Sequence, residues 1–311
     1  MPTNPRVLVA CPLPEAGLEL LRARLTVDAG RGSNGAWLRE HVPGSAAIVA
    51  DPGVRIDGAL LDAAGDSLKV VSNFGVGIDN IDLDSVRRRG VRATNTPHVL
   101  TNATAELTVA LMLAAARQIV DADAGVRRGR WPEGFLGREL FGATVGLVGF
   151  GRIAQRVAEL LDGFGVRLLY ASRSDGAAAA RIERRELGDL LAASDFVSLH
   201  IPLTAQTRHL INATALESMK PGAILVNTSR GGVLDTAALV RALRSGRLAA
   251  AGLDVYEEEP HVPAELRELP NAVLLPHIGS ATTATRDAMA RLCAENVIAV
   301  IEGREPPAAV V

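Results

Sequence analysis

The sequence has little of several residue types that would mark particular classes of protein. Among 311 residues there are only two cysteines, Cys11 and Cys293, which lie far apart and belong to no CxxC motif or Cys/His cluster. Neither a disulfide scaffold nor a zinc or other metal site is therefore supported, and a reducing compartment is favoured. Aromatic residues make up only 3% of the chain, and all 33 basic residues are arginine except Lys69 and Lys220. The arginine excess by itself indicates no function.

An excess of charge and long apolar runs are also lacking. The formal net charge is -2 with acids and bases interspersed, so no basic stripe is available for nucleic acid or an anionic membrane. The most apolar stretch, residues 107–116, is much shorter than the ~20 residues of a membrane span. The apolar run after Arg6 does not resemble a secretory signal. We therefore expect a cytoplasmic protein that binds neither nucleic acid nor membranes.

Short aliphatic segments alternate with helical patterns along the chain. The length corresponds to about two domains of roughly 150 residues each. Strands of a parallel sheet that is covered on both faces are continuously apolar. Segments of this kind occupy residues 7–10, 47–50, 70–73, 145–149, 167–170, 196–201, 223–227, 250–253 and 273–275. Their alternation with helices predicts an α/β fold with parallel sheets.

Two longer helices are predicted. Residues 101–128 begin with the polar pair Thr101-Asn102 and carry apolar residues at helical spacing, so we expect one continuous helix bridging two lobes. Residues 283–302 form an apolar stripe that stops at Gly303. We expect the smaller domain to be discontinuous and to combine the N-terminal third of the chain with this last helix.

A glycine-rich turn follows the strand at 145–149. Residues 149–154 read Gly-Phe-Gly-Arg-Ile-Ala, a GxGxxA motif that opens a helix. Gly149 permits a tight turn, and Gly151 leaves room for a pyrophosphate at the backbone. The helix N-terminus at Arg152 and Ile153 offers N–H groups to the phosphates. Because strand, turn, helix and second strand follow in order, a dinucleotide site is favoured over a merely structural turn.

The residue that would contact the adenosine ribose, about 20 positions further on, is not acidic. The segment there reads Ala171-Ser172-Arg173-Ser174, with Ser172 where a carboxylate selective for NAD would stand. No carboxylate repels a 2'-phosphate, and Arg173 with two serine hydroxyl groups can bind it, so NADP is the preferred cofactor. The alternative is a solvated Arg173 and an enzyme that also accepts NAD.

Four further motifs identify a family. They read NFGVGIDN at 73–80, VNTSRGGVLD at 226–235, GLDVYEEEP at 252–260 and LPHIGSAT at 275–282. Together with the glycine-rich turn and in this order, they resemble the D-isomer-specific 2-hydroxyacid dehydrogenases. The resemblance implies two Rossmann-like or flavodoxin-like domains with the catalytic cleft between them. The dinucleotide-binding domain would span 98–285, and the substrate-binding domain 1–97 with 286–311.

The chemistry of that family suits residues in these motifs. Reduction of a 2-keto acid needs a hydride at the keto carbon, a proton at its oxygen and a grip on the carboxylate. Arg230 can polarise the carbonyl and clamp the carboxylate with its planar fork of donors. His277 is the natural proton donor, and Glu259 would hold its ring and favour the imidazolium. Backbone N–H groups of Val76 and Gly77 would bind the carboxylate.

The resemblance also implies cofactor contacts for residues outside this catalytic set. Asp254, Thr104 and Thr228 would lie at the nicotinamide end, and Pro202 and Thr207 near the adenine.

Neighbouring titratable residues receive no function from the motifs. Glu259 is the last of three consecutive glutamates and is selected by motif register, so Glu257 and Glu258 are expected to be solvated. His209 has no comparable constellation, and His200 lies near the nucleotide edge.

The family resemblance further implies a homodimer, formed through the nucleotide domains and the bridging helix. Trp131 follows that helix in a loop rich in glycine and proline. It would either cover a cleft, including that of the partner, or pack at the dimer contact.

Within the family, Ser172 and the short chain favour glyoxylate, hydroxypyruvate or hydroxyphenylpyruvate reductases. Phosphoglycerate dehydrogenase and phosphite dehydrogenase are the enzyme alternatives. A dinucleotide-sensing scaffold similar to the corepressors that share this fold is the non-enzyme alternative.

Overall fold

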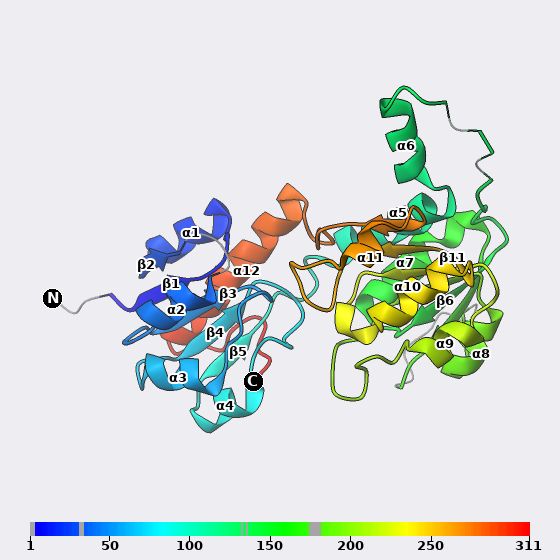
Figure 1. The fold of residues 1–311 in the computed structure, drawn as a ribbon. Coiled ribbons are helices and arrows are strands. Elements are labelled where there is room, and N and C mark those ends of the chain that lie inside the picture. The colour runs from blue at the N-terminus through cyan, green and yellow to red at the C-terminus, as the bar shows by residue number, and fades with distance from the viewer. Residues whose placement is uncertain (1–3, 31–33, 132, 135, 174–181) are drawn as a thin grey trace. The chain divides into compact units, whose positions relative to one another are not determined.

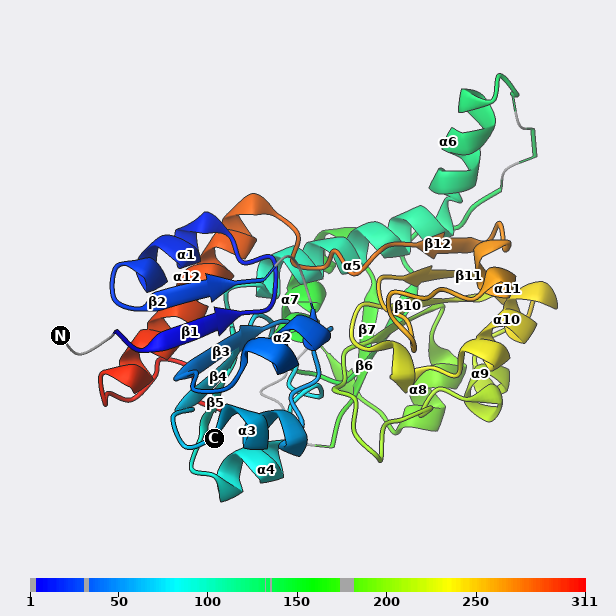
Figure 2. The same cartoon turned by 60° about the vertical axis from the view of Figure 1, so that its left-hand side comes forward.

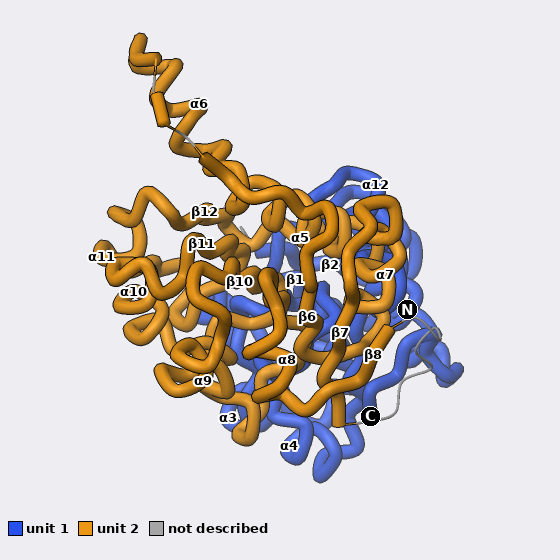
Figure 3. The backbone as a smooth tube through the Cα atoms, turned by 90° about the vertical axis from the view of Figure 1, so that its right-hand side faces the viewer, with its two compact units in different colours: residues 1–100, 281–311 blue, residues 101–280 orange. Residues whose placement is uncertain are grey.

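The protein divides into two compact units. The computed structural model describes residues 4–30, 34–131, 133–134, 136–173 and 182–311. Unit 1 contains Met1–Leu100 and Ala281–Val311, and unit 2 contains Thr101–Ser280, coloured blue and orange in Figure 3. The chain passes from one unit to the other at 100/101 and 280/281, close to the expected 97/98 and 285/286.

Unit 1 is built on a five-stranded parallel sheet in the order β2-β1-β3-β4-β5. The strands are β1 (Arg6–Val9), β2 (Thr26–Ala29), β3 (Ala47–Ala50), β4 (Val70–Asn73) and β5 (Arg92–Thr94). The helices are α1 (Glu15–Arg22), α2 (Gly35–His41), α3 (Gly58–Ala64), α4 (Leu83–Arg88) and α12 (Thr283–Ile301). The final helix is confirmed: the Thr282 hydroxyl caps its start, and the helix packs against α1 and β4.

Unit 2 is built on a seven-stranded parallel sheet in the order β12-β11-β10-β9-β6-β7-β8. The strands are β6 (Thr144–Val148), β7 (Arg167–Ala171), β8 (Glu183–Arg184), β9 (Phe196–Leu199), β10 (Ala223–Asn227), β11 (Leu248–Leu253) and β12 (Ala272–Leu274). The α-helices are α5 (Thr101–Ala116), α6 (Ile119–Arg127), α7 (Arg152–Leu160), α8 (Leu187–Ala193), α9 (Ala213–Ser218), α10 (Thr236–Arg244) and α11 (Ala264–Arg267). Figures 1 and 2 show these helices around the sheet. The α/β class with parallel sheets is thereby confirmed.

Both faces of the unit 2 sheet are covered, which explains its continuously apolar strands. On β10, Ile224 and Val226 join a buried cluster with α5 and α7, whereas Leu225 joins the cluster of α8, α9 and α10 on the other face. Side chains alternate between the two faces of a strand, so both registers must be apolar when helices cover both sides.

The expected continuous helix over 101–128 is wrong. Two helices, α5 and α6, meet at a bend of 65°, and Gln118 at the bend has a left-handed φ of 51°. Figures 1 and 2 show α6 projecting from the rest of unit 2. Within the described residues no single helix has the length and apolar character to cross a membrane; only this bent pair, taken together, meets those criteria.

The three strands that the apolar pattern missed, β2, β5 and β8, all lie at sheet edges. Glu183 and Arg184 of β8 are exposed, and β2 and β5 carry Asp28 and Arg92. An edge strand has one neighbouring strand and less covering surface, so its sequence needs no continuous apolar run.

Candidate active site

The glycine-rich turn lies between β6 and α7, at the carboxyl end of the sheet. The strand order reverses between β6 and β9, the usual place for ligands of open α/β sheets. Gly149 has a φ of 91°, and a Cβ there would lie 2.5 Å from the carbonyl oxygen of His200, so only glycine fits. A Cβ on Gly151 would meet nothing within 4 Å. This open space before the first turn of α7, which begins with Arg152 and Ile153, fits the pyrophosphate of a dinucleotide.

The end of β7 carries the residues expected at the adenosine ribose. Ser172 follows β7 directly and is partly buried, whereas Arg173 is exposed. Ser174 lies outside the described residues. Sequence reasoning missed Arg184 on β8, whose Nη2 donates to the carbonyl oxygen of Ser172 at 2.9 Å. The fold therefore brings the guanidinium of Arg184, in addition to Arg173, to the end of β7. No sequence motif predicted this position.

The loop after β9 contains Pro202 and Thr207, which were expected near the adenine. The Thr207 hydroxyl donates to the carbonyl oxygen of Pro202 at 2.7 Å and accepts from the Thr204 N–H at 2.8 Å. This side chain thus shapes the loop itself. His200 begins the loop and bonds through Nε2 to the Ser198 hydroxyl at 2.9 Å, and burial lowers the pKa of His200 to about 4. The imidazole is therefore neutral at pH 7.

Asp254, after the end of β11, fixes the loop that carries His277. Its two carboxylate oxygens accept the N–H groups of Ile278 and Gly279, each at 2.7 Å, and the residue is buried. Burial raises the pKa of Asp254, although these donors and the nearby His277 act in the opposite direction. Because both oxygens have backbone partners, the carboxylate acts first as an anchor for residues 277–279.

Three threonines lie beside this loop. A Cβ on Gly279 would be 3.5 Å from Cγ2 of Thr104. The Thr108 hydroxyl donates to the Thr104 carbonyl oxygen at 2.8 Å and lies 2.9 Å from the Thr228 hydroxyl. Thr104 and Thr228, both expected at the nicotinamide end, are thus joined through Thr108. Sequence reasoning missed Thr108, although it stands one helical turn after Thr104.

His277 and Glu259 form a hydrogen-bonded pair. Nδ1 of His277 lies 2.6 Å from Oε2 of Glu259, and Oε1 of Glu259 accepts the Tyr256 N–H at 2.8 Å. His277 has a φ of 54°, a left-handed conformation that is uncommon outside glycine. The Tyr256 hydroxyl donates to the Leu275 carbonyl oxygen at 2.9 Å. Burial, with the charges of Asp254 and Glu259, raises the pKa of Tyr256 to about 12, so the phenol keeps its proton and braces the loop.

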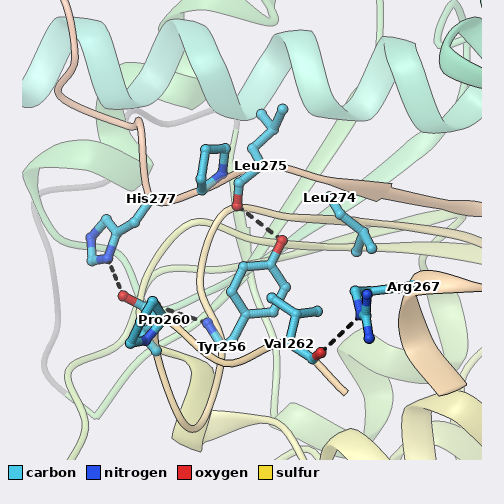
Figure 4. Close-up of a pocket in the computed structure, with 9 residues that line it drawn as sticks. Tyr256, Pro260, Val262, Arg267, Leu274, Leu275 and His277 are labelled. Atoms are coloured by element: carbon cyan, nitrogen blue, oxygen red, sulfur yellow. Dashed lines mark hydrogen bonds and ion pairs between the residues drawn. The ribbon is translucent and has the colours of Figure 1, made fainter. Parts of the chain in front are cut away.

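A cavity of about 360 Å³ lies next to this pair. Figure 4 shows His277 at one end, Tyr256 in the middle and Arg267 at the other end, with Val262 and Leu274 along the lining. Arg267 donates from Nε to the Val262 carbonyl oxygen at 3.1 Å. The imidazole–carboxylate pair therefore borders a largely apolar space.

Arg230 lies in the loop after β10. The buried Asn227 shapes this loop: its Oδ1 accepts from the Ser229 N–H at 3.0 Å, and its Nδ2 donates to the Arg230 carbonyl oxygen at 2.9 Å. The next residue, Gly231, packs against the backbone of Tyr256, since a Cβ on Gly231 would lie 1.9 Å from the Tyr256 carbonyl carbon. The segment with Arg230 therefore touches the segment with Glu259. Sequence reasoning did not select Asn227.

Val76 and Gly77 lie in the loop after β4 of unit 1. Asn95 Nδ2 donates to the Val76 carbonyl oxygen at 2.8 Å, and Asn73 Nδ2 donates to the Gly77 carbonyl oxygen at 2.5 Å. Both carbonyl groups are thus held by side chains. Within the described part of the chain no hydrogen bond uses the N–H of Val76 or Gly77, so both donors are available to an anion.

Glu257 is exposed, as expected, but its carboxylate also has partners in the protein. Its Oε2 lies 2.6 Å from Nε2 of His209, and its Oε1 accepts the Thr236 N–H at 2.9 Å. His209, to which the motifs assigned no role, is the partner. The two residues are 48 positions apart, and only the fold brings them together.

Similarity to known proteins extends over nearly the whole chain. Residues 109–279 match the family model of the D-isomer specific 2-hydroxyacid dehydrogenase, NAD binding domain. The glyoxylate reductase of Thermococcus onnurineus is 47% identical, with 98% of this chain and 95% of the relative covered.

Solved structures agree with this match. The TT0316 protein from Thermus thermophilus has a TM-score of 0.92 and 47% identity, over 98% of this chain and 100% of that one. The NADPH-dependent glyoxylate/hydroxypyruvate reductase from Sinorhizobium meliloti, solved with NADP and malonate, also has a TM-score of 0.92, with 35% identity over 99% and 97%.

Proposed function

The chain belongs to the family of D-isomer specific 2-hydroxyacid dehydrogenases, and we propose that it reduces glyoxylate and hydroxypyruvate, with NADPH preferred to NADH. The observation that carries the proposal is the 2.6 Å contact between His277 and Glu259, a pairing suited to deliver a proton in keto-acid reduction. The names of the Thermococcus and Sinorhizobium relatives support the substrates, and the latter supports the cofactor.

His277 is the proposed proton donor. Glu259 engages its Nδ1, so the proton would leave from Nε2 toward the keto oxygen. The carboxylate fixes the orientation of the ring, while the Tyr256 N–H holds the carboxylate in turn. Once the proton has been transferred, the ring is neutral. Solvent can return a proton to it, because the His277 side chain is 37% exposed.

Arg230 is the proposed clamp on substrate. Its guanidinium would polarise the keto group and hold the carboxylate in two parallel hydrogen bonds. The N–H groups of Val76 and Gly77 are proposed to bind the same carboxylate. These contacts engage only the carboxylate and the keto group, so a small 2-keto acid offers all the groups that they recognise.

The nicotinamide dinucleotide, when bound, supplies the hydride to the keto carbon. We propose that Gly149, Gly151 and the N–H groups at Arg152 and Ile153 hold its pyrophosphate. Thr104, Thr228 and Asp254 would adjoin the nicotinamide, and Pro202 and Thr207 the adenine. A 2'-phosphate would be held by Ser172, Arg173 and Ser174, with Arg184 as an added positive charge at the same strand end.

A substrate panel tests this proposal. Purified protein is mixed with glyoxylate, hydroxypyruvate, hydroxyphenylpyruvate or 3-phosphohydroxypyruvate, and oxidation of NADPH or NADH is followed by absorbance. We expect the highest kcat/KM with glyoxylate or hydroxypyruvate and NADPH. Highest activity with the phosphorylated keto acid, or with phosphite in the oxidative direction, would identify one of the alternative enzymes. Dinucleotide binding without turnover of any acid would favour the sensing scaffold.

We further propose a cytoplasmic homodimer. The α6 region exposes Ile119, Val120, Val126, Trp131, Leu136 and Phe141, with Trp131 83% and Leu136 89% accessible in the isolated chain. Exposed large apolar side chains that cluster in one part of the chain are typical of a subunit interface. A second copy of the chain is the proposed partner.

A further inference from the structure

A second imidazole–carboxylate pair stands beside the proposed catalytic pair. His209 and Glu257 contact each other at 2.6 Å, as do His277 and Glu259. Both glutamates belong to the segment 256–259, and both histidines have a left-handed φ, 50° at His209 and 54° at His277. Non-glycine residues hold this conformation only where the surrounding structure enforces it, and such residues cluster at functional sites.

The His209–Glu257 pair ties three segments together. His209 lies in the loop after β9, and its N–H donates to the Gly232 carbonyl oxygen at 2.9 Å. The second oxygen of Glu257 accepts the Thr236 N–H at the start of α10. Burial raises the pKa of Glu257, but the bonds from Thr236 and His209 outweigh it and lower that pKa, so the residue is a carboxylate at pH 7. One side chain thus anchors 256–259 to the loop at 209 and to α10.

Gly231 connects segment 256–259 to Arg230. Its missing side chain lets the backbone of Tyr256 and Glu257 lie directly against it: a Cβ there would be 1.9 Å from the Tyr256 carbonyl carbon and 2.4 Å from the Glu257 nitrogen. Arg230 precedes Gly231, and the Tyr256 N–H holds Glu259. A shift of 256–257 would therefore move Arg230 and Glu259 together.

We propose that His209 and Glu257 are positioning residues for keto-acid reduction: they hold segment 256–259 against Gly231 and so orient both Arg230 and Glu259. This inference rests on the proposed function. The side chains are 41% and 24% exposed, and a side-chain pair with this much solvent contact contributes little to the free energy of unfolding. We therefore expect variants of the pair to fold, so that a loss of turnover reports on the geometry of the site.

The test compares Glu257→Ala, Glu257→Gln and His209→Ala with a matched control, Glu258→Ala, on the adjacent glutamate. We expect Glu257→Ala to lower kcat for glyoxylate by about tenfold to a hundredfold, since displacement by an ångström is enough to do so. The KM and Kd for NADPH should stay within about twofold, because the glycine-rich turn is elsewhere. Glu257→Gln should recover to within about threefold of wild type, since its amide oxygen still accepts from Thr236 and its N–H can donate to His209. The control should match wild type.

A double-variant cycle tests the pairing itself. If His209 acts through Glu257, His209→Ala should cost little in a chain that already carries Glu257→Ala. Fully multiplicative losses would overturn the pairing, and a kcat of Glu257→Ala within twofold of wild type would overturn the positioning role. A parallel loss of NADPH affinity, or no recovery in Glu257→Gln, would also overturn it, because both indicate general damage. If wild type itself lacks turnover, the proposed function is wrong and the inference falls with it.

Discussion

The backbone of Tyr256 lies directly on Gly231, with space for a hydrogen but not for a carbon: a Cβ would come within 1.9 Å of the Tyr256 carbonyl carbon. The two residues belong to different motifs, one beside Arg230 and the other three positions before Glu259. This contact makes the two motifs one structural block.

Gly231→Ala should therefore be far more damaging than the same change one residue later. We expect kcat/KM to fall by about 10² or more, because backbone on both sides must move. Gly232→Ala is the matched control, since a Cβ there meets only side-chain atoms, of Leu203 at 3.1 Å and of Arg208 at 3.4 Å, and should cost less than about fivefold. Steady-state kinetics of both variants, with thermal unfolding to verify folding, provides the measurement. Equal losses in the two would contradict the backbone contact as the cause.

Replacement of the proposed proton donor should remove most turnover. His277→Gln is expected to lower kcat by about 10² to 10⁴, the usual contribution of general acid catalysis. Cofactor affinity, measured by fluorescence titration with NADPH, should change little. A variant that kept more than about a tenth of wild-type kcat would show that another group delivers the proton.

A carboxylate at position 172 should reverse the cofactor preference. Ser172→Asp places a negative charge where the 2'-phosphate would bind, and we expect KM for NADPH to rise by about tenfold or more while NADH is used at least as well as before. Arg173→Ala should also raise KM for NADPH. Measuring both cofactors with each variant provides an internal control. An unchanged KM for NADPH in both variants would refute the assigned ribose site.

His200 should make the stability of the apo protein depend on pH. Its pKa is about 4 in the folded chain against 6.5 for an ordinary histidine, because burial disfavours the charged ring. Between pH 4 and 6.5 the unfolded chain binds a proton at His200 and the folded chain does not. The contribution of neutral His200 to the free energy of unfolding is therefore fully present above pH 6.5 and is lost as the pH falls toward 4.

The expected loss from His200 is about 1 to 3 kcal/mol, given that one pKa unit corresponds to about 1.4 kcal/mol and that the residue is not wholly enclosed. Denaturant unfolding at pH 7, 5.5 and 4.5 measures it. His200→Gln should show a shallower decline, and identical slopes in wild type and variant would exclude His200 as the source.

The exposed apolar residues around α6 should determine the oligomeric state. Val120→Asp combined with Leu136→Asp is expected to convert a dimer to a monomer in analytical ultracentrifugation, because charge on the apolar core of an interface opposes burial. Asp121→Ala, a polar change on the same helix, should leave the dimer intact. Monomeric wild-type protein at micromolar concentration would contradict the proposed interface.

Apolar pattern and motif order predicted much of this protein. The central strands could be recognised because a sheet covered on both faces needs apolar residues in both registers, as at Ile224 and Leu225 on β10. The edge strands and the bend at Gln118 could not. Edge strands need no such pattern. A left-handed conformation is predicted from sequence mainly at glycine or asparagine, so Gln118 gave no signal of the bend.

The α/β class, the parallel sheets, the glycine-rich turn and the family could all be read from the amino-acid sequence, because these depend on local patterns and on motifs in fixed order. Motif register also singled out Glu259 among three glutamates. Nothing in the sequence indicated that Glu257 binds His209, that Asp254 anchors the loop of His277, or that Arg184 contacts the end of β7; these contacts became visible in the fold. These contacts join residues distant in sequence, and their geometry is set by which strand ends the sheet places side by side.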